Sequence, residues 1–323
     1  MTIYLNTKDV NQNPFYQTIR SGYLFNYSLG KMRAAAFMSG SGSNFKEIYK
    51  TQKSLESKLN GKSPFEIVCV FTDTEKGYEN AGKIITDITG KIVTIPRIYL
   101  NPKKVIPEQY LITQDKTLRE SERLIYDEKA VSELMAHNVN CGILAGYMRL
   151  LSPYIINRML CMNVHPGPLN IIDPFTGKRK FTGDSAVKKQ ILAGREYLQS
   201  TVNVAREGAD TGEILMLSNR LPVDLEGHTF EKLISDSNLL EEIANKNQSK
   251  LKEVGDLNIF PKVVIFAAKS LYTFDKNWQI KLNHPRHLHH CNLQFHPEEM
   301  ENWEIDDYYD DLISNLIHYN QKK

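Results

Sequence analysis

Two polar side chains in the middle of the chain have types and spacing that suit stabilising an oxyanion and moving a proton. Asn163 and His165 lie at the end of an apolar run, residues 160–164. They are two residues apart, so on a strand they would share one face. An amide donor beside an imidazole can stabilise a developing oxyanion and move a proton. On spacing alone there is an alternative: His165 is a core histidine and Asn163 is a turn former.

The apolar run just upstream predicts where these groups would lie. Residues 139–145 form a run that is apolar except for Asn140 and ends before Gly146, which indicates a buried strand with a loop at its carboxyl end. In open α/β sheets, ligands bind outside the carboxyl ends of the strands. Two consecutive strands would therefore bring their loops to one site.

A glycine-rich turn near the start of the chain has the outline of an anion site. The sequence SGSGSN, residues 39–44, follows an apolar run at 32–38 and precedes an amphipathic helix. Glycines allow close backbone approach, and free amides at a helix start favour an anion. Asn44 with Glu47 three residues later also predicts a capping box. The alternative is a plain tight turn between a strand and a helix.

Apolar and periodic segments alternate along the chain in a way that predicts the fold. Strands are expected at residues 32–38, 65–72, 92–95, 139–145, 160–164, 200–205 and 214–218. Helices are expected at 45–59, 75–88, 123–137, 183–193, 230–254, 260–271 and 305–317, with one further short strand at 109–113. This order predicts an α/β fold with a mostly parallel, Rossmann-like sheet and helices on both faces.

Composition limits the classes of function. The chain has 323 residues, 41% hydrophobic and 24% charged, with a net charge of +2. This suits a globular core, and nothing global indicates a nucleic-acid or membrane partner. We find no apolar run of membrane-spanning length and no signal-peptide core at the N-terminus. Cys69, Cys141 and Cys161 fall in apolar runs and are expected to be core thiols in a reducing cytoplasm.

Three segments together resemble the folate-dependent formyltransferase family. They are LAGYMRLLSP at 144–153, NVHP at 163–166 and GADTG at 208–212. The resemblance is greatest to members that formylate glycinamide ribonucleotide, and it covers roughly residues 32–270. It implies formyl transfer from 10-formyltetrahydrofolate to a primary amine, with Asn163, His165 and Asp210 as the catalytic set. From its own sequence context, Asp210 is equally a turn residue.

The resemblance also implies binding roles at particular positions. Gly42, Ser43 and Asn44 would hold the phosphate of the acceptor. Asp256 would bind the acceptor where the family has a glutamate, one methylene longer. Folate would be bound by Arg123 and by the loop after residue 145, whose members are Tyr147, Met148, Arg149, Leu150 and Leu151. Apolar side chains with a few backbone polar groups suit a flat pteridine ring, although these residues could equally be ordinary core.

The sequence departs from the family pattern next to the candidate histidine. The family commonly reads HPSLLP where this chain has HPGPLN, and the basic segment 173–180 then adds a loop. Segment 97–122 is also longer than usual. These departures leave two alternatives open: a family member acting on another amine, such as an amino sugar, or a nonenzymatic folate- or nucleotide-binding relative. The expected partners are small-molecule substrates, without nucleic acid or membrane; the choice between monomer and homodimer is open.

The chain divides into an N-terminal extension at 1–31, a formyltransferase domain at 32–271 and a C-terminal extension at 272–323. The C-terminal extension contains several histidines and one cysteine whose spacing matches no strong zinc pattern. We expect a solvated appendage and no metal site. The residues concerned are His284, His287, His289, His290, Cys291 and His296.

Overall fold

The central sheet has the predicted α/β organisation. In the computed structural model the described residues are 19, 21–91, 95–108, 116–283, 294–295 and 302–321. Within them a seven-stranded sheet has the order β3-β2-β1-β4-β5-β7-β8, parallel from β3 to β5 and antiparallel at β7 and β8. Its strands are β1 (Met32–Met38), β2 (Phe65–Thr72), β3 (Arg97–Tyr99), β4 (Cys141–Leu144), β5 (Leu160–His165), β7 (Thr201–Val204) and β8 (Ile214–Leu217).

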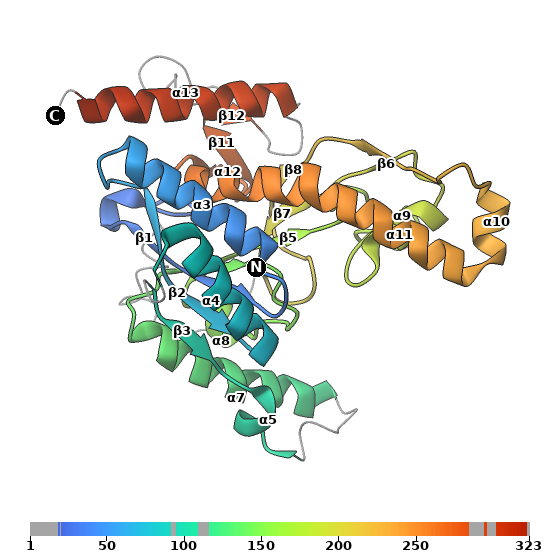
Figure 1. Cartoon of the computed structure of the whole chain (residues 1–323), viewed down its shortest axis with the longest axis horizontal. Helices are drawn as coiled ribbons and strands as arrows, with labels where there is room; N and C mark the ends of the chain where they lie inside the picture. Colours follow the sequence, from blue (N-terminus) through green and yellow to red (C-terminus); the bar gives the residue numbers. More distant parts are fainter. Residues whose placement is uncertain are drawn as a thin grey trace.

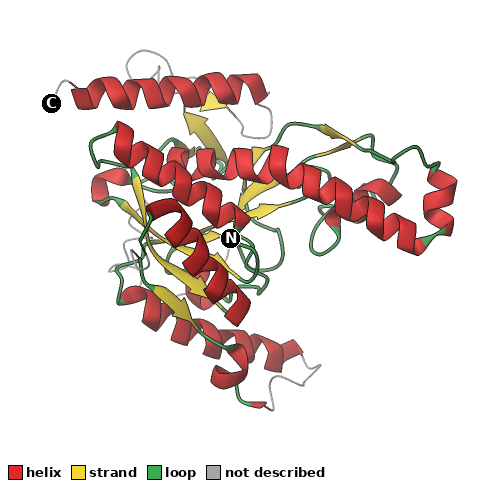
Figure 2. Cartoon of the chain, in the orientation of Figure 1, coloured by secondary structure: helices red, strands yellow, loops and turns green. Residues whose placement is uncertain are grey.

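Helices cover both faces of this sheet, as the alternation within β1 requires (Figures 1 and 2). Ala34 and Ala36 belong to one buried cluster and Ala35 and Phe37 to another. The first cluster takes in α3 (Ser43–Lys58), α4 (Glu75–Thr89) and α12 (Leu257–Ala268). The second takes in α7 (Lys116–Met135) and α8 (Pro153–Ile156), with the short α5 (Pro102–Val105) nearby.

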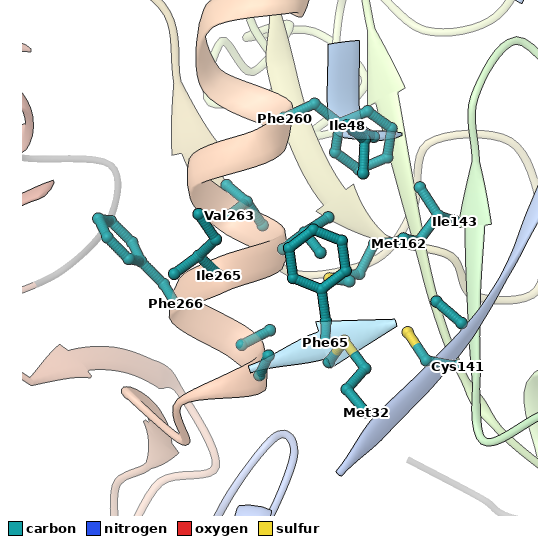
Figure 3. Close-up of a cluster of buried hydrophobic side chains, with 14 of the residues drawn as sticks. Met32, Ile48, Phe65, Cys141, Ile143, Met162, Phe260, Val263, Ile265 and Phe266 are labelled. Carbon is teal, nitrogen blue, oxygen red and sulfur yellow. The ribbon is translucent and has the colours of Figure 1, made fainter. Parts of the chain in front are cut away.

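The first cluster is the larger core of the molecule. Figure 3 shows α12 presenting Phe260, Val263 and Ile265 toward side chains of the sheet, among them Phe65 and Met162. Burial of a large apolar side chain is worth roughly 1.5–3 kcal/mol. This packing fixes α12 against the sheet, and thereby fixes the segment just before α12.

A lobe with its own small core extends from the sheet, on the right of Figure 1. It contains α9 (Ala186–Leu192), β6 (Tyr197–Leu198), β9 (Leu221–Pro222), α10 (Phe230–Ser235) and α11 (Ser237–Leu251). The prediction of one helix over 230–254 is wrong, because the Asp236 side chain accepts a hydrogen bond from Leu239 N and starts a new helix. A π-helix, η2 (Lys252–Asp256), then joins α11 to α12.

The described parts of both extensions pack on the domain. The C-terminal one contains β10 (Tyr272–Phe274), β11 (Ile280–Asn283), β12 (Gln294–Phe295) and α13 (Asn302–Gln321). Tyr272 is fully buried and its carbonyl accepts from Leu24 N, while Phe274 N donates to Gly22 O. A short helix, η1 (Tyr27–Leu29), follows this pairing. The division at residues 31 and 271 therefore remains a proposal about sequence relationship, since the packing crosses it.

A few further expectations differ from the structure or lie outside its described part. The third strand is Arg97–Tyr99, beyond the predicted 92–95, of which 92–94 are not described. Helix α9 begins later than predicted, because Ser185 before it is left-handed at φ 57°. The predicted strand at 109–113 and the tail residues considered as metal ligands, His284, His287, His289, His290, Cys291 and His296, also lie outside the described residues. No helix in the described ranges is long and apolar enough to cross a membrane.

Candidate functional site

The carboxyl ends of β4 and β5 open into a cavity of about 400 Å³. Its walls come from the start of α3, the loop after β4, the end of β5, the segments around residues 183 and 208, and the π-helix. Ten of the thirteen sequence-predicted site residues line it: Asn44, Tyr147, Met148, Arg149, Leu150, Leu151, Asn163, His165, Asp210 and Asp256.

His165 and Asp210 form a buried pair at one end of the cavity. His165 Nδ1 lies 3.2 Å from Asp210 Oδ2, and both side chains are less than a tenth exposed. The Asn163 amide nitrogen lies 3.5 Å from the other carboxylate oxygen, at the long limit of a hydrogen bond. The strand pattern that predicted a shared face for Asn163 and His165 thus brings both to one carboxylate. This arrangement supplies a donor, a titratable ring and an anion within one small volume.

The turn between β7 and β8 holds Asp210 in place through an unusual backbone. Asp210 has φ 55°, in the left-handed region that aspartate tolerates better than most residues. Gly212 two residues later has no room for a side chain, since a Cβ would lie 1.8 Å from Val204 O. The Asp-Thr-Gly sequence is therefore turn chemistry, and the same turn delivers the carboxylate to the cavity.

The basic loop after β5 closes over the His165–Asp210 pair. Arg179 donates to the carbonyls of Asp210 and Gly212 at 2.5 and 2.7 Å, and Gly183 N donates to Asp210 Oδ2 at 2.7 Å. The carbonyl of Phe181 lies 2.6 Å from His165 Nε2. The sequence predicted this loop beside the site, and the contacts show that it touches the His165–Asp210 pair itself.

Another part of the cavity wall is built from Asn44 and Asp256. Ser200 Oγ donates to Asp256 Oδ1 at 2.5 Å, and Gly255 makes this possible, because a Cβ there would lie 2.8 Å from Ser200 Oγ. Burial raises the pKa of the Asp256 carboxyl above its usual value, against the opposing effects of Ser200, Lys252 and Asn44. The Asn44 amide oxygen is buried and has no hydrogen-bond partner among the described residues. A polar atom buried without a partner costs free energy, so this part of the wall is suited to receive a polar ligand.

The loop after β4 forms a further part of the cavity wall. Met148 and Leu150 are 75% and 44% exposed, whereas Tyr147 is buried against Phe37. The Arg149 guanidinium pairs with Glu122 and lies 4.6 Å from the centre of the Tyr126 ring. This wall combines exposed apolar side chains with one fixed cation.

The foot of this loop is tied to α7 by a buried carboxylate. Asp127 accepts from Ser152 N at 2.5 Å. Burial raises the pKa of Asp127 to about 6, opposed by the Ser152 hydrogen bonds and by the charges of Arg149 and Arg123. Arg123 therefore lies near the root of the loop, but it does not line the cavity.

The glycine-rich turn lies at the helix start that its sequence predicted, but its side chains behave differently. No side chain caps α3, so the capping box predicted for Asn44 and Glu47 is wrong: the Asn44 side chain lines the cavity and bonds Asp256 instead. Gly42 precedes the helix at φ 71°, and a Cβ there would lie 2.6 Å from Met38 Cε, inside the core. Gly42 and Ser43 do not line the cavity, and only their backbone amides could serve an anion at the uncapped helix start.

Several cavity groups had no signal in the sequence. Asn203 lies directly across from Asn163 in the β5–β7 pairing, and its amide oxygen is buried without a partner in the described structure. Gln248 and Lys252 reach the cavity from α11 and η2. The Phe181 carbonyl is a main-chain atom that no motif could mark. The one available signal was Gly167, where the chain departs from the family pattern.

Comparison with known proteins agrees with this architecture. A crystal structure of glycinamide ribonucleotide transformylase 1 from Symbiobacterium toebii aligns with a TM-score of 0.50 and 22% identity, covering 78% of this chain and 94% of that one. This likeness confirms the fold.

Two relatives share sequence with the chain. The trifunctional purine biosynthetic protein adenosine-3 of Chironomus tentans is 27% identical over 239 residues, 73% of this chain. A methionyl-tRNA formyltransferase of Lachnospira eligens is 32% identical over 112 residues, 33% of this chain. The matches span only 15% and 32% of those proteins. The model of the formyl transferase family matches residues 32–244. Because that match takes in most of the chain, the protein belongs to the formyl transferase family.

Proposed function

We propose that this chain transfers a formyl group from 10-formyltetrahydrofolate to the primary amine of glycinamide ribonucleotide, a step of purine biosynthesis. The observation that carries the proposal is the meeting of Asn163, His165 and Asp210 at one end of the cavity. The family membership supports formyl transfer. The acceptor rests on the resemblance and on the uncapped start of α3.

The cavity walls fit a folate at one side and a polar acceptor at the other. Exposed Met148 and Leu150, with the fixed guanidinium of Arg149, would hold the folate, and bound folate supplies the formyl group. The orphaned amide oxygen of Asn44 and the buried Asp256 would meet the polar hydroxyls of the acceptor. The amides of Gly42, Ser43 and Asn44 would meet its phosphate, because a helix start favours an anion.

At the reacting end, each residue would have a separate task. The Asn163 amide donates to the formyl oxygen as negative charge develops on it. His165, held by Asp210, places a positive charge close to that oxygen. Asp210 takes up the proton of the attacking amine through water and returns it to the folate nitrogen as the bond from that nitrogen to the formyl carbon breaks, so that tetrahydrofolate leaves. The buried free thiols Cys69, Cys141 and Cys161 agree with action in the reducing cytoplasm.

Turnover with defined acceptors tests this proposal. The purified full chain is assayed with 10-formyltetrahydrofolate and glycinamide ribonucleotide, its dephosphorylated nucleoside, and an amino sugar phosphate. We expect the ribonucleotide to have the highest kcat/KM. Equal use of the dephosphorylated nucleoside would refute the proposed phosphate site. Preference for the amino sugar phosphate would refute glycinamide ribonucleotide as the acceptor. No turnover with any acceptor would favour a binding relative.

A further inference from the structure

Asn203 is a buried amide of the cavity wall to which the proposed reaction gives no task. Its side chain is only 1% exposed and lines the cavity. The amide oxygen has no hydrogen-bond partner among the described residues. An acceptor buried without a partner costs free energy, so its presence in a cavity wall calls for a ligand group that pairs with it.

The strand pairing places this amide beside Asn163. Asn203 lies directly across from Asn163 in the antiparallel β5–β7 pair, so the two side chains project from the same face of the sheet. Residues that face each other in such a pair have Cα atoms about 4.5–5.5 Å apart. His165 and Thr201 form the facing pair two residues along on the same face. Asn203 therefore adjoins the residues to which formyl transfer is assigned.

The nitrogen of the Asn203 amide already has a partner, which leaves the oxygen for a ligand. Asn203 Nδ2 donates to Val204 O at 3.0 Å. Exchanging the oxygen and nitrogen of the amide would turn two acceptors toward each other, so this hydrogen bond fixes the orientation of the side chain. The free group of Asn203 is thus an acceptor, and the partner that it lacks is a donor.

Among the reacting groups, only the amine can supply that donor. The formyl oxygen is itself an acceptor, whereas a neutral primary amine has two N–H groups and one lone pair. In the proposed reaction one amine proton passes to Asp210 through water. An acceptor for the other N–H stops the amine from rotating, and its lone pair then points at the formyl carbon.

We propose that Asn203 Oδ1 accepts a hydrogen bond from the attacking amine and so directs the lone pair of its nitrogen at the formyl carbon. This role rests on the proposed function, which supplies the amine. As the carbon–nitrogen bond forms, the nitrogen becomes positively charged and the hydrogen bond strengthens. An amide oxygen is too weak a base to keep the proton, which still passes to Asp210 through water. Asn163 thus donates to the formyl oxygen, and Asn203 accepts from the nucleophile.

The first experiment measures binding to the wild-type full chain without turnover. Calorimetry in the absence of folate compares glycinamide ribonucleotide with acetamide ribonucleotide, which has a hydrogen in place of the amine. The measurement is made at about pH 9, where an α-amino group is mostly neutral. We expect glycinamide ribonucleotide to bind about fivefold to tenfold more tightly, the value of one hydrogen bond. Equal binding of the two ribonucleotides would overturn the proposal.

The second experiment removes the amide oxygen. Asn203→Leu keeps nearly the same size but has no acceptor, so it should bind the two ribonucleotides equally. The matched control is Ser63→Ala, which removes another buried side-chain oxygen that has no partner in the described structure. Ser63 precedes β2 and does not line the cavity, so Ser63→Ala should keep the wild-type preference. A preference for the amine that survives in Asn203→Leu would overturn the proposal.

Turnover of the same variants reports the strengthening of this hydrogen bond during the reaction. We expect kcat of Asn203→Leu to fall about 10–10²-fold, because hydrogen bonds to charged groups are worth that much. KM for 10-formyltetrahydrofolate should not change, and Ser63→Ala should keep the wild-type kcat. An unchanged kcat in Asn203→Leu would contradict the role of Asn203. Should that variant fail to fold, Asn203→Val removes the same oxygen with a residue that favours strands.

The wild type distinguishes failure of this role from failure of the proposed function. A wild type that binds neither ribonucleotide and formylates no acceptor would refute the proposed function, and the role of Asn203 with it. A wild type that formylates glycinamide ribonucleotide, together with an equally active Asn203→Leu, would refute the role of Asn203 alone.

Discussion

Two buried aspartates, Asp210 and Asp256, line the cavity, and their surroundings differ. Asp210 is enclosed by His165, Asn163 and Gly183, and a loop closes over it. Asp256 is held by Ser200 and Asn44, and the Asn44 amide oxygen beside it still has no partner among the described residues. Both carboxylate oxygens of Asp210 have partners, whereas the Asn44 amide oxygen beside Asp256 has none among the described residues. The difference indicates that the Asp210 side chain is held in place without ligand and that a polar ligand would complete the surroundings of Asp256.

The largest effect on turnover should come from changes to His165 and Asp210. His165→Ala or Asp210→Asn should lower kcat by about 10²–10⁴-fold with little change in KM, because each removes a group that acts on developing charge. The double variant should lose little more than either single one, since the two side chains act as a unit. Steady-state kinetics of the three variants measures this. Near-full activity in either single variant would break the assignment of roles.

Loss of the Asp256 carboxylate should affect binding of the acceptor more than the rate of transfer. Asp256→Asn keeps the shape but removes one acceptor oxygen and the charge, so KM for the acceptor should rise about tenfold, the value of one good hydrogen bond. The control is Glu253→Gln, one turn away on the same π-helix and exposed. A large fall in kcat with unchanged KM in Asp256→Asn would contradict a binding role and would indicate that Asp256, like Asp210, acts on the rate of transfer.

The phosphate assignment at the start of α3 can be tested by charge. Ser41→Asp places a carboxylate in the exposed turn before the helix, where it would repel a phosphate yet suit the helix start. We expect KM for the acceptor to rise several-fold, up to about tenfold, with KM for folate unchanged and the melting temperature not lowered. Ser54→Asp, on an exposed position farther along the same helix, is the control. Equal effects from both variants would argue against an anion at this helix start.

The smallest expected effect is on stability, and it comes from protonation of Asp256. Its folded-state pKa is raised, so the native protein keeps a proton that the unfolded chain loses as pH rises above about 4. The wild type should therefore lose stability relative to Asp256→Asn as pH rises from there to the folded-state pKa, by ~1.4 kcal/mol for every pH unit that separates the folded and unfolded pKa values. Urea unfolding of both proteins between pH 4 and pH 8 measures the difference. A constant difference would show that Asp256 is not perturbed.

Local pattern was enough to predict most strands of the sheet, whereas the candidate catalytic residues were predicted from the family resemblance. The apolar runs at 32–38 and 160–164 are short-range signals, and the structure has a strand at both. Asp210 was predicted from the resemblance, and in the structure it lies in a turn where Gly212 admits no side chain. The strands depend on neighbouring residues alone, so they can be recognised from the sequence without knowledge of the fold.

The parts that escaped prediction depend on contacts between distant segments. The Asn44 side chain does not cap α3 but bonds Asp256, which lies in the π-helix more than 200 residues later in the sequence. The Phe181 carbonyl contacts His165 through a main-chain oxygen, which every residue type has, so no sequence motif could indicate it. The break at Asp236 could have been found, since an aspartate followed by helix formers is a recognised cap, but the continuous apolar periodicity outweighed it.

The pairing of residues 22–27 with residues 270–274 has a consequence for synthesis. Tyr27 N donates to Ser270 Oγ across 243 residues, and Leu24 N and Phe274 N donate to Tyr272 O and Gly22 O. On the ribosome, residues 22–27 emerge long before residues 270–274, so these hydrogen bonds form only after almost the whole domain has been translated. Until then Leu24 and Phe25, which are buried in the finished molecule, lack the cover that this pairing supplies. A nascent chain stalled before residue 270 would thus expose apolar surface at these two residues, where chaperones could bind it.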